Sequence, residues 1–266
     1  GRDRDGQLFF TMKKVDGQDL REILFDLRQE VPEVVEKFPL PRLLDILIQV
    51  CQTISYSHNL GVIHRDLKPA NIIVGKFGEV YVLDWGLAKV LGSPSLTDPK
   101  DIQNEKSDAT LTPVGRHYGT PMYMPPEIAK GEPDLDGRTD VFSLGIILFE
   151  MLTLSFFVEG TDPYEIKKQI LERPLPLPRE IAPNRNIPRD LQAICMKALK
   201  RNKSERYPSV SSFLEDLQRY RHQEEVSVYW YSGWEKLTRW NNRNAYLILA
   251  LLSALLGAGI HAIFSM

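Results

Sequence analysis

The sequence predicts a mainly α-helical protein of the α+β class, with one short β-hairpin and a single transmembrane helix near its C-terminal end. Two observations predict the first part: several segments have apolar residues at helical spacing, and two short β-rich runs flank a glycine-containing turn. The third observation is that the 20 residues 245–264 contain no Asp, Glu, Lys or Arg. A helix of that length extends about 30 Å, which is the thickness of a bilayer core.

Helices are predicted where apolar residues recur every three or four positions. The predicted helices cover residues 18–29, 42–58, 140–154, 189–200 and 208–222. The segment 140–154 is apolar on nearly all sides, so we expect it to be buried at the centre of its domain.

Strands are predicted where short runs are rich in β-branched and aromatic residues, at 8–12, 71–74 and 80–83. The last two should form a hairpin, because a turn with two glycines joins them. Three prolines between residues 32 and 41 predict a loop, and the polar segment 90–118 predicts a mobile loop.

The composition is that of an ordinary globular protein and excludes several classes. Hydrophobic residues make up 43% and charged residues 26% of the 266 positions, which excludes a disordered chain. Cys51 and Cys195 form no CxxC pair, so we expect reduced, packed thiols in an intracellular portion. The net charge of −2 provides no basic surplus for nucleic-acid binding.

Polar residues at motif spacing are concentrated between residues 64 and 127. The run VIHRDLKPANIIV contains His64, Arg65, Asp66, Lys68 and Asn71, and VLDWGLAK follows with Asp84-Trp85-Gly86. These residues resemble the H-R-D-x-K-x-x-N loop and D-F-G triplet of eukaryotic-type protein Ser/Thr kinases, in particular the bacterial membrane-anchored ones. The A-P-E triplet of that family is present as Pro125-Pro126-Glu127.

The resemblance implies the C-terminal lobe of a protein kinase. The run LFFTMKKVDG resembles the hinge between the two lobes, with Met12 at the gatekeeper position and Lys13 to Val15 offering backbone groups to adenine. Only about eleven residues precede Met12, so we expect the Gly-rich loop and strand lysine of an N-terminal lobe to be absent from this chain. The expected parts are a hinge and C-lobe (1–225), a juxtamembrane segment (226–244) and a transmembrane helix (245–264).

The resemblance also implies roles for individual residues, with ATP and Mg²⁺ as cofactors. Asp66 would take the proton of the incoming hydroxyl, and Lys68 would offset charge on the γ-phosphate. Asn71 and Asp84 would bind Mg²⁺, which prefers hard oxygen ligands. In the substrate loop GTPMYM, Thr120 would lie near Asp66 and Lys68.

Further residues have implied supporting roles. Asp140 would hold the backbone of the catalytic loop, and Arg206 would form a buried ion pair with Glu127. Arg65 indicates activation by phosphorylation of Thr110 or Thr112, although these threonines could equally be solvated loop residues.

The resulting hypothesis is a membrane-anchored signalling kinase that phosphorylates Ser and Thr of proteins, with a dimer as one arrangement for autophosphorylation. Lys236, Arg239 and Arg243 flank the apolar run on its N-terminal side, which places the kinase portion in the cytoplasm. Tyr and Trp residues between 229 and 240 suit the headgroup zone, whereas the small residues and His261 in the run leave a core helix open. The alternative function is a catalytically inactive kinase-like membrane scaffold without an N-lobe, and we expect the chain alone to be weakly active or inactive.

Overall fold

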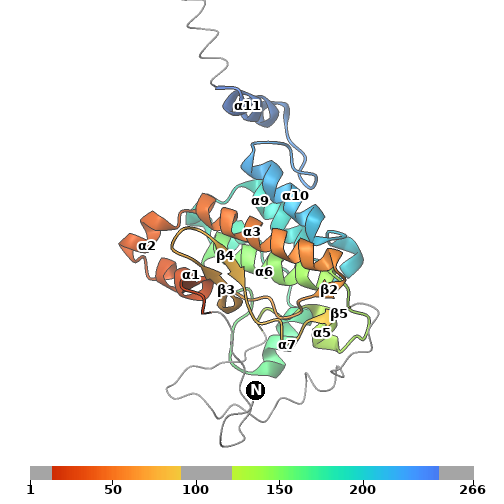
Figure 1. The fold of residues 1–266 in the computed structure, drawn as a ribbon. Helices are drawn as coiled ribbons and strands as arrows, with labels where there is room; N and C mark the ends of the chain where they lie inside the picture. Colours follow the sequence, from red (N-terminus) through yellow and green to blue (C-terminus); the bar gives the residue numbers. More distant parts are fainter. Residues whose placement is uncertain (1–13, 91–121, 246–266) are drawn as a thin grey trace, which may run out of the picture.

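The computed structural model describes residues 14–90 and 122–245, which form a helical lobe with two small sheets (Figure 1). Its helices are α1 Leu20–Arg28, α2 Pro32–Lys37, α3 Leu40–Asn59, α5 Pro126–Lys130, α6 Arg138–Thr153, α7 Pro163–Glu172, α8 Pro178–Ile181, α9 Arg189–Ala198, α10 Val210–Arg221 and α11 Gly233–Arg243. Short 3-10 turns cover Pro69–Asn71, Pro183–Arg185 and Lys203–Glu205. The mainly helical α+β prediction is confirmed.

Two small antiparallel sheets carry the loops of interest. Strands β1 Gln18–Asp19, β3 Ile72–Val74 and β4 Val80–Val82 form one sheet in the order β1-β3-β4, which confirms the predicted hairpin. Strands β2 Val62–Ile63 and β5 Lys89–Val90 form the other. This second pair joins the chain just before residues 64–71 to the chain just after the D-W-G triplet.

Helix α6 forms the centre of the lobe, as its sequence predicts. All of its residues after Arg138 are buried, and it packs against α3 and α9. At the crossing with α9, a Cβ on Gly145 would lie 2.8 Å from the Cβ of Ala198, so the close approach requires glycine. Cys51 and Cys195 are buried free thiols in the same core, and burial raises the pKa of both.

The prediction of a loop between residues 32 and 41 is wrong, because this segment contains α2 and the start of α3. Pro32 lies in the first turn of α2, Pro39 is the N-cap of α3 and Pro41 lies in the first turn of α3. Proline is tolerated at these positions because the first backbone N–H groups of a helix have no partner within the helix. Helices α7 and α8 also begin with a proline, and neither was predicted from the sequence.

Several predictions fall outside the described residues. These are the strand over 8–12, the positions Met12, Lys13, Thr110, Thr112 and Thr120, and the loop over 90–118 apart from Val90. The predicted transmembrane helix also falls there, except for Ala245. Among residues 14–90 and 122–245, no helix is both long enough and apolar enough to cross a membrane.

Candidate active site

The backbone of the loop after β2 is held by a buried carboxylate. Asp140, in the first turn of α6, accepts hydrogen bonds from the backbone N–H of His64 and of Arg65, both at 2.9 Å. His58, at the end of α3, contacts the same carboxylate through Nε2 at 2.7 Å. The Asp140 side chain is fully buried, so a single carboxylate inside the lobe links α6, the end of α3 and the loop after β2. The predicted role of Asp140 is confirmed.

His64 and Arg65 join this loop to the D-W-G segment. The His64 ring contacts the carbonyl of Leu83 through Nε2 at 3.1 Å, and its centroid lies 4.6 Å from that of Trp85. Arg65 has a left-handed backbone with φ of 69° and donates Nε–H to the carbonyl of Leu87. Partial burial lowers the pKa of Arg65.

Three predicted catalytic side chains lie together in the loop. The Nζ of Lys68 is 2.6 Å from Oδ2 of Asp66, and Nδ2 of Asn71 lies 2.9 Å from the Asp66 carbonyl and 3.3 Å from the same Oδ2. Asp66 lies in the loop beyond β2, after α3 has ended at Asn59. Two donors therefore orient one oxygen of the Asp66 carboxylate.

The β3–β4 hairpin places Asn71 and Asp84 at its open end. The backbone N–H of Leu83 donates to the carbonyl of Asn71 at 2.8 Å, and Asp84 is the next residue. Asp84 is exposed, has a left-handed backbone with φ of 61°, and its carboxylate has no hydrogen-bond or ion-pair partner among the described residues. The side-chain amide nitrogen of Asn71 faces Asp66, so the amide oxygen of Asn71 is left for another ligand.

This donor set fits a magnesium ion that is shared with a nucleotide. Asn71 and Asp84 supply two hard oxygens, and Mg²⁺ at such sites takes its remaining ligands from phosphate and water. The part of the chain that is described contains no cluster of three or more His, Cys, Asp or Glu suited to a metal, so Asn71 and Asp84 do not form a closed protein cage.

Only part of the predicted nucleotide site is described. Val15 is half-buried and lies three residues before β1, whereas Met12, Lys13 and Thr120 lie outside the described residues. After Val15 the chain passes close to β3, because a Cβ on Gly17 would lie 2.5 Å from the carbonyl oxygen of Val74. The end of the hinge-like run is therefore packed against the hairpin.

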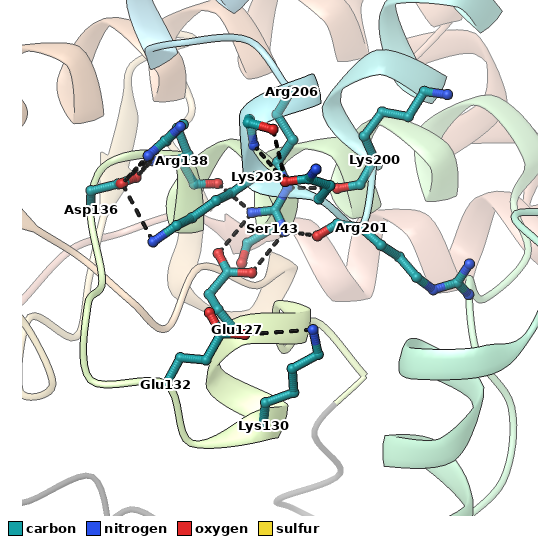
Figure 2. A network of polar contacts seen from close by, with 12 residues as sticks. Glu127, Lys130, Glu132, Asp136, Arg138, Ser143, Lys200, Arg201, Lys203 and Arg206 are labelled. Carbon is teal, nitrogen blue, oxygen red and sulfur yellow. Dashed lines mark hydrogen bonds and ion pairs between the residues drawn. The ribbon is translucent and has the colours of Figure 1, made fainter.

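A buried ion pair holds α5 against the lobe (Figure 2). Arg206 and Glu127 form two parallel hydrogen bonds of 2.7 Å, and their side chains are 0% and 3% exposed. The other three N–H groups of Arg206 donate to the carbonyls of Arg138, Lys200 and Arg201. The predicted pair is confirmed, and every guanidinium N–H has an acceptor.

A second buried network lies around Tyr123, and it was not predicted from the sequence. Glu150, near the end of α6, accepts from Arg28 of α1 and from the hydroxyl of Tyr123. Burial raises the pKa of Glu150 and also that of Tyr123. Ser143 of α6 donates to the carbonyl of Tyr123 at 3.0 Å. Tyr123, in the described end of the GTPMYM run, is thus fixed to α6 at two points.

Comparison with known proteins gives one consistent result. The model of the protein kinase domain family matches residues 3–217. The serine/threonine-protein kinase PknD of Chlamydia pneumoniae is 38% identical over 219 residues, which cover 79% of this chain and 23% of that protein. PknD of Protochlamydia amoebophila is 37% identical over 222 residues, which cover 80% and 22%. The chain spans less than a quarter of the length of these curated relatives.

Proposed function

The chain belongs to the protein kinase domain family, and from this membership we propose that it transfers the γ-phosphate of ATP to Ser and Thr hydroxyls of proteins. The observation that carries the proposal is the convergence of Asp66, Lys68 and Asn71 within hydrogen-bonding distance. The relatives named above are Ser/Thr kinases, and this supports hydroxyls of Ser and Thr as acceptors.

In this proposal the loop performs the proton transfer and the charge stabilisation. One oxygen of Asp66 is oriented by Lys68 and Asn71, so the carboxylate is positioned to accept the hydroxyl proton of the substrate. Lys68 also carries the positive charge that would stabilise the transferring phosphoryl group. When bound, Mg²⁺ neutralises charge on the nucleotide phosphates, and Asn71 and Asp84 would hold it.

Asp140 supports this chemistry from behind the loop. Asp140 fixes the backbone on which Asp66 is carried, because it binds the two residues immediately before it. A fixed backbone matters because phosphoryl transfer depends mainly on positioning and electrostatics. In the same proposal, Thr120 lies near Asp66 and Lys68 and helps to seat the substrate hydroxyl.

We further propose that the protein is anchored in a membrane through residues 245–264, with the kinase portion on the cytoplasmic side. Support comes from the sequence, which has 20 consecutive residues without a formal charge directly after Arg243 and Asn244. Extraction of membranes with alkaline carbonate tests this proposal. Release of the protein into the soluble fraction would contradict it.

The catalytic proposal is tested by phosphate transfer in the intact protein. Asp66→Asn should lower the transfer rate about 10²–10⁴-fold, which is the range for loss of a positioned general base. Asp84→Asn should also abolish transfer, and it should weaken Mg²⁺-dependent nucleotide binding. Lys76→Ala, in the exposed turn of the same hairpin, is the matched control and should transfer phosphate like wild type.

Two outcomes would contradict the catalytic proposal. If Asp66→Asn or Asp84→Asn transferred phosphate at the wild-type rate, the role assigned to that residue would be contradicted. If the wild-type protein and Lys76→Ala are folded and bind ATP but transfer no phosphate, the inactive membrane scaffold would be favoured instead.

A further inference from the structure

Helix α11 has two opposite sides with different environments. In the helix Gly233–Arg243, only Glu235 and Arg239 are partly buried, and every other residue is exposed. These two residues lie on one side, because positions i and i+4 face the same way on a helix. Figure 1 shows α11 at the end of the lobe away from α5 and α7.

The inner side of α11 is fixed to the lobe by polar contacts. Arg239 forms an ion pair with Asp190 of α9 and donates to the carbonyl of Glu224 at 3.0 Å. Its guanidinium also lies 4.7 Å from the ring centre of Tyr231, which is buried in the core and contacts Asp190 through its hydroxyl at 3.2 Å. Glu235 accepts from the hydroxyl of Tyr229 at 2.8 Å. The orientation of α11 on the lobe is therefore set.

The outer side of α11 carries large apolar side chains in water. Trp234, Leu237 and Trp240 are 79%, 53% and 52% exposed, and their spacing of three residues places them on one face. Trp230, just before the helix, is 93% exposed. Three of the four tryptophans of the chain are thus exposed in α11 or just before it, and we call the side of the helix formed by Trp234, Leu237 and Trp240 the tryptophan face.

We propose that the tryptophan face binds the lipid surface, so that α11 lies flat in the headgroup region while its other side holds the lobe. This inference rests on the proposed membrane anchor and adds to it a second contact with a defined orientation. Large amphipathic indole rings favour the headgroup region, and a helix with one apolar and one polar side lies in the plane of the interface.

The position of α11 in the chain identifies lipid as its partner. The helix ends at Arg243, Asn244 is its C-cap, and the uncharged run begins at Ala245. An anchor that starts at Ala245 would keep α11 at the membrane surface, whichever way the helix is inclined. Helix α11 ends at its C-cap Asn244, so its axis need not continue into an anchor that starts at Ala245. A separate protein partner has no comparable support in the structure.

Trp234 distinguishes a flat helix from an upright one. If α11 stood upright on the membrane, Trp234 would be about 16 Å from Ala245, beyond the reach of the acyl chains, since each residue adds about 1.5 Å. If α11 lies flat, Trp234 and Trp240 are at the same depth. Trp240 is close to the membrane in both arrangements, so it cannot distinguish them.

The experiment uses the full chain in vesicles of phosphatidylcholine with bromine on the acyl chains near the glycerol end, which quenches nearby tryptophan. The starting variant has Trp230→Tyr, Trp234→Tyr and Trp240→Tyr, which leaves Trp85 as a common background. Trp234 is then restored alone. The matched control instead adds Tyr164→Trp, on the exposed surface of α7 at the other end of the lobe. Emission is compared with that in unbrominated vesicles.

We expect quenching of restored Trp234 and none of the tryptophan at position 164. An unquenched Trp234 in protein that resists carbonate extraction would overturn the flat orientation and leave the anchor standing. Quenched Trp234 in protein that carbonate releases would support the tryptophan face and contradict the anchor. Equal quenching at positions 234 and 164 would overturn the inference, because the lobe would then have no preferred orientation.

Discussion

The loop that carries Asp66 and the helix α11 depart from the usual burial pattern in opposite directions. Around the loop, polar groups such as Asp140 and Arg206 are buried in the lobe. On α11, apolar groups such as Trp234 are in water. Both arrangements are costly when the groups have no partner, since buried charge needs hydrogen bonds and exposed apolar surface favours contact with another apolar phase.

The two regions differ in where these groups find a partner. Within the described part of the chain, no buried side-chain nitrogen or oxygen lacks a hydrogen bond, so the polar centre is satisfied by the protein itself. The tryptophan face has no such cover from the lobe. The comparison teaches that the polar centre finds its partners within the lobe, whereas the tryptophan face is left open to the lipid surface proposed above.

The largest expected effect comes from breaking the polar centre at Arg206. Arg206→Ala should lower the free energy of unfolding by about 3–5 kcal/mol, because it leaves the buried Glu127 carboxylate without its partner. Urea unfolding of the full chain in detergent measures this. Arg219→Ala is the control: it removes a weak pair of 4.0 Å between an exposed arginine of α10 and the buried Asp216. It should change the free energy of unfolding by less than about 0.5 kcal/mol, because Asp216 keeps its hydrogen bonds from Tyr207 and Ser227. Equal effects of the two substitutions would contradict the comparison.

A smaller effect is expected at Asp140. Asp140→Asn keeps one oxygen but places an amide nitrogen against a backbone N–H, so the free energy of unfolding should fall by about 1–3 kcal/mol. Phosphate transfer by the intact protein should slow more than ATP binding weakens, because the loop that carries Asp66 loses its support. An equal loss in transfer and in ATP binding would indicate general damage to the fold and would contradict a positioning role.

The smallest effect is expected where α11 meets the lobe. Arg239→Gln should lower the free energy of opening of α11 by roughly 1 kcal/mol, because Asp190 keeps the hydrogen bonds from Tyr231 and from the Leu191 N–H. Hydrogen exchange of the α11 amides should accelerate while exchange in α6 stays unchanged. Lys236→Gln removes an ion pair that is half exposed at both ends and is the matched control. Acceleration in α6 as well would show that α11 is part of the core, and the distinction drawn above would fail.

Motif and periodicity together predicted the centre of the molecule well. The buried helix α6, the β3–β4 hairpin and the Arg206–Glu127 pair all follow from local patterns or from a family pattern with fixed spacing. These features are predictable because each depends on residue types that have few alternative uses. A helix apolar on every side has to be buried, and two β-rich runs around a glycine turn pair with each other.

Other features could not be predicted, for two physical reasons. Proline reads as a loop signal, yet α2, α7 and α8 use it in the first turn, where it causes no loss of hydrogen bonding. Contacts between distant side chains leave no local pattern: Arg28 and Glu150 are 122 residues apart. The sequence grouped Tyr231 and Arg239 with the aromatic and cationic residues of the headgroup zone, whereas the structure turns both toward the lobe.

The segment between α10 and α11 has a consequence for how far the proposed kinase could reach. Val226 and Tyr231 are buried in the core of the lobe, so this stretch is no free tether. With α11 on the membrane, the height of Asp66 above the surface would be set by the size of the lobe and not by linker length. Substrates held at that height would meet the site at high effective concentration, and those dissolved in the bulk would not gain in this way.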